Sequence, residues 1–255
     1  MSKHQLTAIT ALFLFLILVI AGFYVSVHPI WFVVLGVVWV TITATGSFSI
    51  SWNFHVQAYC QNPLETRKRV AITFDDGPSE TTALVLDILK KYDVPASFFC
   101  VGRQIERHPT ILQRICREGH IVGNHTHSHS KSFGFYNKQQ VVDELQRTDK
   151  LISDLCGKKP IYFRPPFGVT NPSIRRALSV TKHIVIGWSI RSLDGILSDE
   201  KVILNRIVKR IRPGGVILLH DTSIPTVNIL EQLLVFLQGQ GYTVVPLSQL
   251  LTHEN

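Results

Sequence analysis

Short apolar segments that end in chemically active polar side chains recur through the chain after residue 69. Residues 70–74 precede Asp75 and Asp76, and residues 216–219 precede His220. The segments are apolar on both faces, which is typical of parallel strands whose two faces are buried. They alternate with amphipathic runs at helical spacing, so the pattern predicts parallel strands joined by helical crossovers.

The number of polar strand ends favours a barrel over a doubly wound sheet, because a barrel brings the carboxyl ends of its strands to one face. We therefore predict an α/β fold, a distorted (β/α) barrel of about seven parallel strands preceded by two transmembrane helices. The strands are expected at 70–74, 96–101, 121–123, 162–164, 184–188, 216–219 and 243–246. The helices are expected at 80–92, 109–118, 138–155, 171–178, 200–211 and 227–238.

The first 50 residues contain two apolar segments, and Lys3 is their only Lys, Arg, Asp or Glu. Residues 6–27 and 30–50 are each about 20 residues long, the length that a helix needs to cross the hydrocarbon core. A signal peptide is the alternative, but the first segment is long for one and the second follows at once. We expect three parts: a two-helix membrane anchor (1–50), a linker (51–68) and a catalytic domain (69–255).

The chain is basic, with 26 Lys and Arg against 18 Asp and Glu and a formal net charge of +8. The surplus could attract acidic glycans or anionic lipid headgroups, although an ordinary solvated surface is the simpler interpretation. Basic and aromatic residues are not interleaved, so we expect no nucleic acid partner, and no protein partner is evident. Lys3 and the basic cluster at 67–69 favour the cytoplasmic side by the positive-inside rule.

The four cysteines, Cys60, Cys100, Cys116 and Cys156, show no CxxC spacing. Cys100 lies in an expected strand and Cys116 on an expected amphipathic helix, so both are interpreted as small buried hydrophobic residues. The spacing indicates neither a zinc knuckle nor a disulfide framework. An extracytoplasmic domain would permit a pair that involves Cys60, but the spacing does not identify its partner.

Two adjacent carboxylates at the end of an apolar strand indicate a metal site. Asp75 and Asp76 cannot both be desolvated cheaply unless a positive charge holds them. His125 and His129 lie four residues apart and, with Asp76, complete a ligand set of two histidines and one carboxylate. Zn²⁺ suits these ligands, and Co²⁺, Ni²⁺ or Mn²⁺ would also fit. Asp75 would then be free to act as a base on water, which indicates a metal-dependent hydrolase.

Other interpretations of these side chains stay open at this point. The histidines could belong to a solvated loop, or His127 could replace one of its neighbours, although the Asp pair argues against both. Arg164 could hold a carboxylate in register or form only a structural ion pair. His220 can protonate a leaving amine or alkoxide, and Asp194 could accept a hydrogen bond from it and raise its pKa.

Five ordered motifs resemble the polysaccharide deacetylase family, which is carbohydrate esterase family 4. They are TFDDGP (73–78), HTHSH (125–129), RPPFG (164–168), the Trp188-containing strand that leads to Asp194, and LLHD (218–221). The resemblance runs from about residue 70 to the C-terminus. It implies a distorted (β/α) barrel and the metal-dependent removal of an acetyl group from an N-acetylated sugar.

The resemblance also implies a role for individual side chains. Asp75 would be the base, oriented by Arg164, and the metal ligands would be Asp76, His125 and His129. His220 would be the general acid, supported by Asp194. The backbone N–H near Phe167 would help to bind the oxyanion, and Leu218 would line the acetyl pocket.

One motif departs from the family pattern. Arg191 and Gly195 stand where family members often carry Asp and Trp. The missing Trp removes one wall of the acetyl pocket, and Arg191 adds a cation that can bind phosphate or carboxylate. We expect a substrate with a negative group near the acetamide, unless Arg191 pairs internally with Asp199 or Glu200.

The expected function is a membrane-anchored, metal-dependent deacetylase that removes N-acetyl groups from a cell-envelope glycan or a lipid-linked amino sugar. One alternative is a metal-dependent hydrolase of another amide or ester, including the cyclic amides attacked by a related branch of the family. Another is a catalytically inactive glycan-binding membrane protein. The two apolar segments predict an integral membrane protein with two spans. Resemblance to envelope-glycan deacetylases favours the extracytoplasmic face for its catalytic domain over the side that the basic residues favour.

Overall fold

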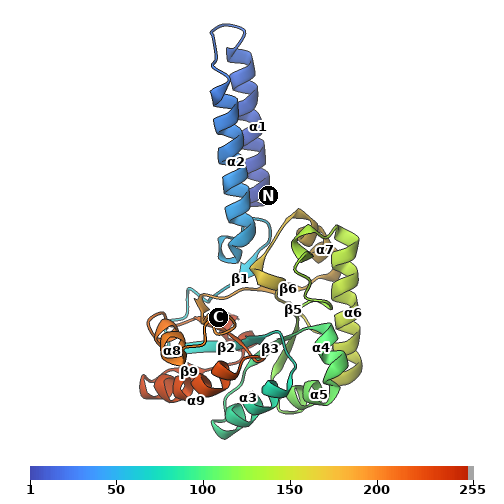
Figure 1. Cartoon of the computed structure of the whole chain (residues 1–255), viewed down its shortest axis with the longest axis vertical. Coiled ribbons are helices and arrows are strands. Elements are labelled where there is room, and N and C mark those ends of the chain that lie inside the picture. Colours follow the sequence, from blue (N-terminus) through green and yellow to red (C-terminus); the bar gives the residue numbers. More distant parts are fainter. Residues whose placement is uncertain (252–255) are drawn as a thin grey trace.

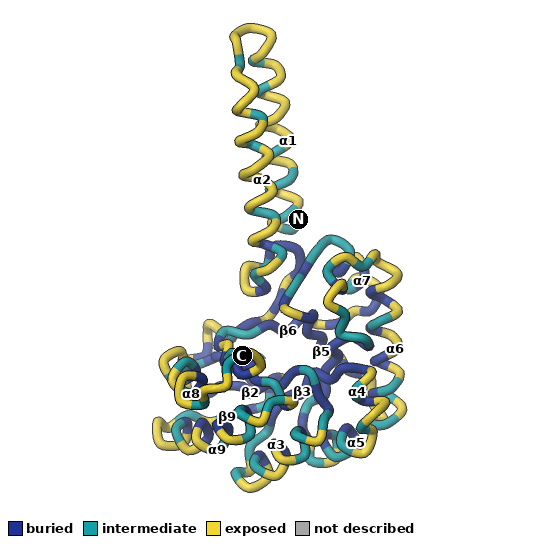
Figure 2. Tube along the Cα trace, in the orientation of Figure 1, coloured by how far each residue is buried: buried dark blue, intermediate teal, exposed yellow. Residues whose placement is uncertain are grey.

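The computed structural model describes residues 1–251. Its first two helices, α1 (Lys3–Ala21) and α2 (Ile30–Phe48), form a hairpin that projects from the rest of the molecule (Figure 1). Each has 19 residues, or about 28 Å at 1.5 Å per residue, against a hydrocarbon core about 30 Å thick. Their side chains are exposed almost throughout (Figure 2). Both are candidate membrane spans by length and composition.

Beyond the hairpin, nine strands with parallel pairings form one sheet in the order β1-β6-β5-β4-β3-β2-β8-β7, and β9 pairs with β2. The strands are β1 (Ala58–Tyr59), β2 (Arg69–Asp75), β3 (Ser97–Cys100), β4 (Ile121–Asn124), β5 (Tyr162–Phe163), β6 (Ile184–Ile186), β7 (Ile190–Arg191), β8 (Val216–His220) and β9 (Thr243–Val244). The sheet curls into a barrel (Figure 1). Because β1 and β7 stand at the two ends of the strand order, the barrel is open along the seam between them.

Helices cover the outside of the sheet, which explains why the strands are apolar on both faces. They are α3 (Glu80–Lys91), α4 (Gly102–Arg107), α5 (Pro109–Arg117), α6 (Lys138–Cys156), α7 (Pro172–Thr181), α8 (Glu200–Val208) and α9 (Ile224–Gly239). Helix α10 (Leu247–Leu251) instead packs with Ala71 of β2 and Val216 of β8 in a separate buried cluster. All seven residues of β2 are buried, and its Phe74 ring stacks on Phe98 of β3 with centroids 5.0 Å apart. The start of α3 is set by Ser79, whose side chain accepts a hydrogen bond from the Thr82 backbone N–H.

The predicted fold class is confirmed, and the seven predicted strands are all present. Two more strands, β1 and β7, were not predicted. Each has only two residues, and neither lies in an apolar run like those that marked the equally short β5 and β9. Helix α4 was also missed, since its six residues follow β3 after only one residue.

Residues 51–68, which we expected to form a linker, pack against the barrel. Strand β1 pairs with β6, and Phe54 and His55 are buried. The Asn62 side-chain amide donates a hydrogen bond to the Leu250 carbonyl at 2.9 Å. The division of the chain into anchor, linker and catalytic domain stays a prediction.

Cys116 and Cys156 form a disulfide that joins α5 to α6. The expectation that Cys116 serves only as a small buried hydrophobic residue is therefore wrong. The spacing carried no sign of this bond, because its two ends are 40 residues apart and meet only through the packing of α5 on α6. In the chain-entropy model, a loop of this length contributes about 4 kcal/mol to the free energy of unfolding. Cys60 and Cys100 are buried and free.

Candidate functional site

The carboxyl ends of β2, β4, β7 and β8, together with the loop after β5, meet around a pocket of about 200 Å³. Eight of the ten site residues predicted from the sequence line this pocket: Asp75, Asp76, His125, His129, Phe167, Arg191, Leu218 and His220. The other two, Arg164 and Asp194, lie behind it and contact Asp75 and His220. The structure therefore brings all ten together, as the barrel prediction requires of strand ends.

The side chains of Asp76, His125 and His129 converge in the geometry of a metal site. The Asp76 Oδ1 atom lies 3.5 Å from His125 Nε2 and 3.3 Å from His129 Nε2. One ligand atom from each residue lies within 4.8 Å of the others. Metal–ligand bonds of about 2 Å place tetrahedral ligand atoms roughly 3.3 Å apart, so these residues fit a divalent cation. His127 points elsewhere, with its Nε2 3.1 Å from Glu106 Oε1.

The three side chains of this triad differ in their protonation. His125 Nδ1 lies 2.7 Å from the Arg164 carbonyl oxygen, to which it can donate its hydrogen, leaving the Nε2 lone pair free. Burial, followed by the charge of His125, lowers the pKa of His129 to about 4 and keeps its imidazole neutral. Burial alone would raise the pKa of Asp76, but His125 and His129 lower it well below its ordinary value. Burial lowers the pKa of His125, but the charge of Asp75 and the hydrogen bond and charge of Asp76 raise it above its ordinary value. Metal binds neutral imidazoles and an ionised carboxylate, so a proton on His125 would have to leave before a cation binds.

Strained backbone conformations cluster around the same pocket. Asp76, Thr126, His129, Phe167 and Leu193 all have positive φ angles, of 78°, 64°, 46°, 59° and 66°. Such conformations cost roughly 1–3 kcal/mol each in residues other than glycine and persist where the surrounding structure enforces them. In four of these five cases the strained residue itself lines the pocket, so the backbone strain helps to position the site.

Asp75 is held by a fully buried arginine. Its Oδ1 atom accepts a hydrogen bond from Arg164 Nη1 at 2.7 Å, and its Oδ2 atom lies 3.8 Å from His125 Nε2. The Arg164 guanidinium lies over the Phe99 ring, 4.1 Å from its centroid, and donates to the Gly187 carbonyl at 2.8 Å. Because both partners are buried, removing either would leave an uncompensated charge, at a cost of about 3–5 kcal/mol. The pair fixes the direction in which Asp75 faces the ligand triad.

His220 approaches the pocket from β8 and is supported by Asp194. His220 Nδ1 lies 2.7 Å from Asp194 Oδ1, and the His220 backbone N–H donates to Asp194 Oδ2 at 2.8 Å. The Ser192 and Thr226 hydroxyls also donate to Asp194. Burial lowers the pKa of His220, but the hydrogen bond and charge of Asp194, with smaller contributions from Asp75 and Asp76, raise it to about 9. His220 is therefore protonated at neutral pH and can donate a proton.

The departure at Arg191 and Gly195 shapes one wall of the pocket. The Arg191 guanidinium lies 5.7 Å from the centroid of the Trp188 ring. Within residues 1–251 no carboxylate pairs with it, since Asp199 accepts a hydrogen bond from the Val202 N–H and Glu200 accepts one from the Asn228 amide. A Cβ atom at Gly195 would lie 3.4 Å from His220 Nδ1. The glycine thus leaves room beside His220, and Arg191 remains available to the pocket.

Several pocket residues carried no assigned role in the sequence analysis. Trp188, Leu193 and Ile196 line the pocket, and Ser192 and Thr226 secure Asp194. The Trp188 motif had pointed to this region without assigning it a contact. Leu193 and Ile196 gave no signal, because an apolar side chain in a loop has no period that would mark its direction.

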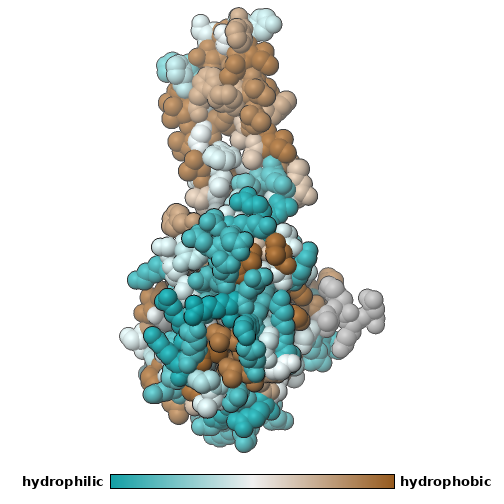
Figure 3. Space-filling view, turned by 90° about the vertical axis from the view of Figure 1, so that its right-hand side faces the viewer, coloured by the Kyte–Doolittle hydropathy of each residue, from teal (hydrophilic) through white to brown (hydrophobic). Residues whose placement is uncertain are grey.

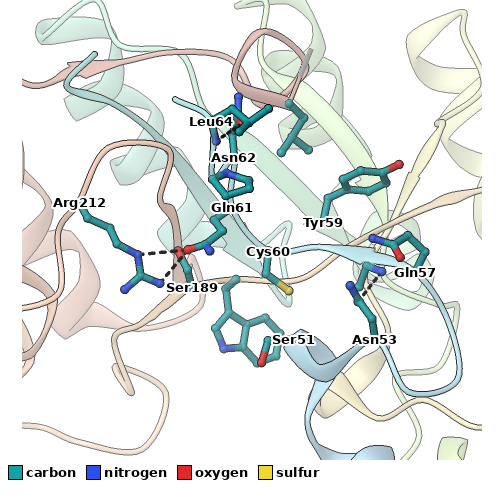
Figure 4. Close-up of a pocket in the computed structure, with 14 residues that line it drawn as sticks. Ser51, Asn53, Gln57, Tyr59, Cys60, Gln61, Asn62, Leu64, Ser189 and Arg212 are labelled. Atoms are coloured by element: carbon teal, nitrogen blue, oxygen red, sulfur yellow. Dashed lines mark hydrogen bonds between the residues drawn. The ribbon is translucent and has the colours of Figure 1, made fainter. Parts of the chain in front are cut away.

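A larger cavity, of about 620 Å³, lies along the open seam of the barrel (Figure 4). Tyr59 and Cys60 line it, and Arg212 donates hydrogen bonds to the Gln61 side chain across it. Of the pocket residues described above, only Trp188 also borders this cavity. Cavity size alone therefore does not locate the chemistry.

Comparison with known proteins supports the assignment of a family. Residues 64–183 match the family model described as polysaccharide deacetylase. The chain is 34% identical to a peptidoglycan-N-acetylglucosamine deacetylase of Bacillus cereus over 197 residues. This alignment covers 74% of this chain and 90% of that protein. Some curated relatives are much longer, and this chain spans only 39% of their length.

Solved structures share the barrel. Peptidoglycan deacetylase PdaC from Bacillus subtilis aligns with a TM-score of 0.68 and 33% identity, over 72% of this chain and 90% of that one. A CE4 family pseudoenzyme from Bacillus anthracis aligns with a TM-score of 0.69 and 28% identity, over 74% of this chain and 66% of that one. The fold alone thus does not separate enzyme from pseudoenzyme. The family model, the sequence identity and the shared barrel together show that this chain belongs to the polysaccharide deacetylase family, carbohydrate esterase family 4.

Proposed function

We propose that this chain is a membrane-anchored, metal-dependent deacetylase that removes N-acetyl groups from a cell-envelope glycan or a lipid-linked amino sugar. One observation carries the proposal: a buried carboxylate, an Asp-His-His ligand set and a charged histidine surround a single pocket. Relatives named as peptidoglycan deacetylases support the substrate class.

Each residue then has a distinct task. Asp76, His125 and His129 would hold the divalent cation, for which Zn²⁺ is the first candidate and Co²⁺, Ni²⁺ or Mn²⁺ are alternatives. When bound, the cation supplies Lewis acidity, which lowers the pKa of water and polarises a carbonyl oxygen.

The proton transfers fall to Asp75 and His220. Asp75, oriented by Arg164, accepts a proton from the water that attacks the acetamide carbonyl carbon. His220 donates a proton to the sugar nitrogen as the C–N bond breaks, so the products are acetate and a free amine. The backbone N–H near Phe167 helps to bind the oxyanion, and Leu218 contacts the acetyl methyl group.

A catalytically inactive glycan-binding protein is the second candidate, because one solved neighbour is described as a pseudoenzyme. The retained side chains argue against it. Asp75, Arg164 and Asp194 are ionisable and buried, and burying such groups lowers the stability of the fold. A protein that only binds glycan does not need these buried groups.

Acetate release from a panel of acetylated substrates tests the proposal. The full chain, purified in detergent, should release acetate from peptidoglycan, a chitooligosaccharide or a lipid-linked N-acetylated sugar. A chelator should abolish the release, and Zn²⁺ or Co²⁺ should restore it. Saturable glycan binding without acetate release under any metal would establish the second candidate instead.

The extracytoplasmic side is supported by the disulfide between Cys116 and Cys156, since disulfides persist mainly in oxidising compartments. We expect the intact chain to stay with the membrane fraction until detergent is added. Protease added to intact spheroplasts should then cut the catalytic domain away, because the domain faces outward. Complete protection of the domain would place it in the cytoplasm.

Asp194→Asn is expected to shift the pH dependence of activity. A proton donor must be protonated, so activity falls as the pH rises through the pKa of His220, which Asp194 helps to raise to about 9. Removing the carboxylate charge lowers that pKa, and the basic limb of the kcat profile should move to lower pH. The measurement is kcat against pH for both proteins. An unchanged basic limb would disconnect Asp194 from the proton donor.

Arg191→Ala is expected to raise KM about tenfold for acetylated sugars that carry a phosphate or carboxylate, because a hydrogen bond to a charged group contributes about 1.5–3 kcal/mol before screening by solvent. KM for neutral sugars should change little. Arg210→Ala, another arginine outside the pocket, is the matched control. Equal effects of Arg191→Ala on neutral and anionic substrates would assign this side chain a structural role.

A further inference from the structure

A second polar cavity, of about 570 Å³, lies where the helical hairpin joins the barrel. Lys3 at the start of α1, His55 in the segment after α2, and Arg175 on α7 line it. None of the residues that line the pocket around Asp75 and His220 borders this cavity. Asn53 and Gln57, which Figure 4 shows at the edge of the seam cavity, also line it.

The cavity is positively charged. Lys3 Nζ donates to the Trp52 carbonyl at 2.8 Å, and Arg175 Nη1 donates to the Ser2 hydroxyl at 2.8 Å. In the described part of the chain neither cation pairs with a carboxylate, and the residues lining the cavity include no Asp or Glu. His183, which also lines the cavity, contacts an acid, since its Nε2 lies 3.0 Å from the buried Asp149. Within residues 1–251 the charges of Lys3 and Arg175 are therefore not neutralised by a carboxylate.

His55 offers a buried polar atom without a partner. The residue is 2% exposed, and its Nε2 lies 3.0 Å from the Ser47 hydroxyl. Its Nδ1 is buried and has no hydrogen-bond partner among residues 1–251. If Ser47 donates to Nε2, then Nδ1 carries a hydrogen and is free to donate to an anion. Burial, followed by the charges of His4 and Arg175, lowers the pKa of His55 to about 4, so the ring is neutral at neutral pH and carries one N–H.

The position of the cavity specifies where an anion would come from. Lys3 begins α1 and Phe48 ends α2, so two apolar helices of membrane-spanning length both terminate here. Figure 3 shows the hydrophobic surface of the hairpin giving way to hydrophilic surface at this level. In a bilayer spanned by the hairpin, the cavity lies at the depth of the lipid headgroups.

Hydrogen bonds and side-chain packing connect the helical hairpin to the barrel. The His4 backbone N–H donates to the Phe54 carbonyl at 3.0 Å, and the Thr170 N–H donates to the Ser47 carbonyl at 2.9 Å. Phe54 also packs against the face of Gly46, where a Cβ atom would lie 2.3 Å from its ring. These contacts hold the cations of α1 and α7 in fixed positions relative to each other.

We propose that the cavity between Lys3, Arg175 and His55 binds the phosphate group of an anionic membrane phospholipid. A guanidinium, an ammonium and an imidazole N–H together supply the donors that a phosphate accepts. The bound headgroup would neutralise the cations and hold the catalytic domain at a fixed height over the bilayer. The inference rests on the membrane anchoring proposed above and is independent of deacetylase activity.

The test uses the full chain, purified in detergent and reconstituted in nanodiscs of phosphatidylcholine with or without phosphatidylglycerol. Native mass spectrometry should show retained phosphatidylglycerol in preference to phosphatidylcholine, and the thermal unfolding temperature should rise with phosphatidylglycerol. Each cation near an anionic surface contributes about 1 kcal/mol, so Arg175→Gln and Lys3→Gln should each reduce the lipid preference about fivefold. Arg176→Gln, the neighbouring exposed arginine outside the cavity, should leave it unchanged.

Arg175→Gln also removes a hydrogen bond to Ser2, so a loss of lipid preference in this variant alone could come from a structural change. Lys3→Gln and Arg176→Gln are therefore measured beside it. Equal retention of the two lipids, or equal losses in Arg175→Gln and Arg176→Gln, would overturn the proposal. Stabilisation by millimolar inorganic phosphate in detergent, equal to that by phosphatidylglycerol, would make it a soluble-anion site and overturn the lipid assignment. Acetate release and membrane fractionation on the same samples report separately on the proposed function.

Discussion

Replacing Asp75 with asparagine is expected to lower kcat for acetate release by at least about 100-fold, because an amide cannot accept the proton that a general base must take. Asn retains an oxygen that can accept the Arg164 hydrogen bond, now 2.7 Å long, so the shape of the pocket should persist. The ligands Asp76, His125 and His129 are untouched, and metal affinity should remain near that of the parent chain. The measurements are steady-state acetate release and a metal titration.

The control for this variant must separate chemistry from stability. Arg164 loses its charged partner in Asp75→Asn, so thermal unfolding is measured beside kcat, and activity is assayed well below the unfolding temperature. Asp87→Asn, an exposed carboxylate paired with Arg114, should keep full activity. Near-parental kcat in a folded Asp75→Asn protein would remove Asp75 from the proposed mechanism.

Replacing His129 with glutamine is expected to weaken metal binding by at least about 100-fold and to abolish acetate release at limiting metal. The variant loses one of three metal ligands. Mutating a residue that only hydrogen-bonds to a metal ligand costs about 10–100-fold in metal affinity, so the loss of a ligand itself should cost at least as much. The measurement is competition for Zn²⁺ against a chelator of known affinity, followed by acetate release at matched metal occupancy.

His127→Gln is the matched control, since His127 lies two residues away and contacts Glu106 instead of the triad. It should bind metal with the affinity of the parent chain, although it can lose some stability. If the two variants bind Zn²⁺ equally well, or if His127→Gln alone loses the metal, the assignment of Asp76, His125 and His129 is wrong.

The sequence predicted which side chains meet at the pocket because its signals are local. The adjacent carboxylates Asp75 and Asp76 and the four-residue step from His125 to His129 are visible without any knowledge of packing. The parallel-strand pattern then predicted that distant strand ends meet. The resemblance to a family implied the pairings of Arg164 with Asp75 and of Asp194 with His220, and both contacts are present at 2.7 Å.

The same signals failed where a residue's partner depends on helix packing. Nothing in the apolar spacing around Cys116 indicated Cys156, because the bond requires α5 and α6 to lie side by side. The pairing of β1 with β6 inside the expected linker also gave no signal, since β1 is too short to show a pattern.

The sequence by itself determined the order of the seven predicted strands and the helices between them, the two membrane-length apolar segments and the identity of the chemical groups, because periodicity and strand-end polarity act over a few residues. Only the tertiary structure decided the open seam between β1 and β7, the position of the Arg191 guanidinium at the pocket and the cationic cavity of Lys3 and Arg175. Lys3 and Arg175 stand far apart in the chain. Their proximity results from many small packing and hydrogen-bond contributions, and no local pattern encodes that sum.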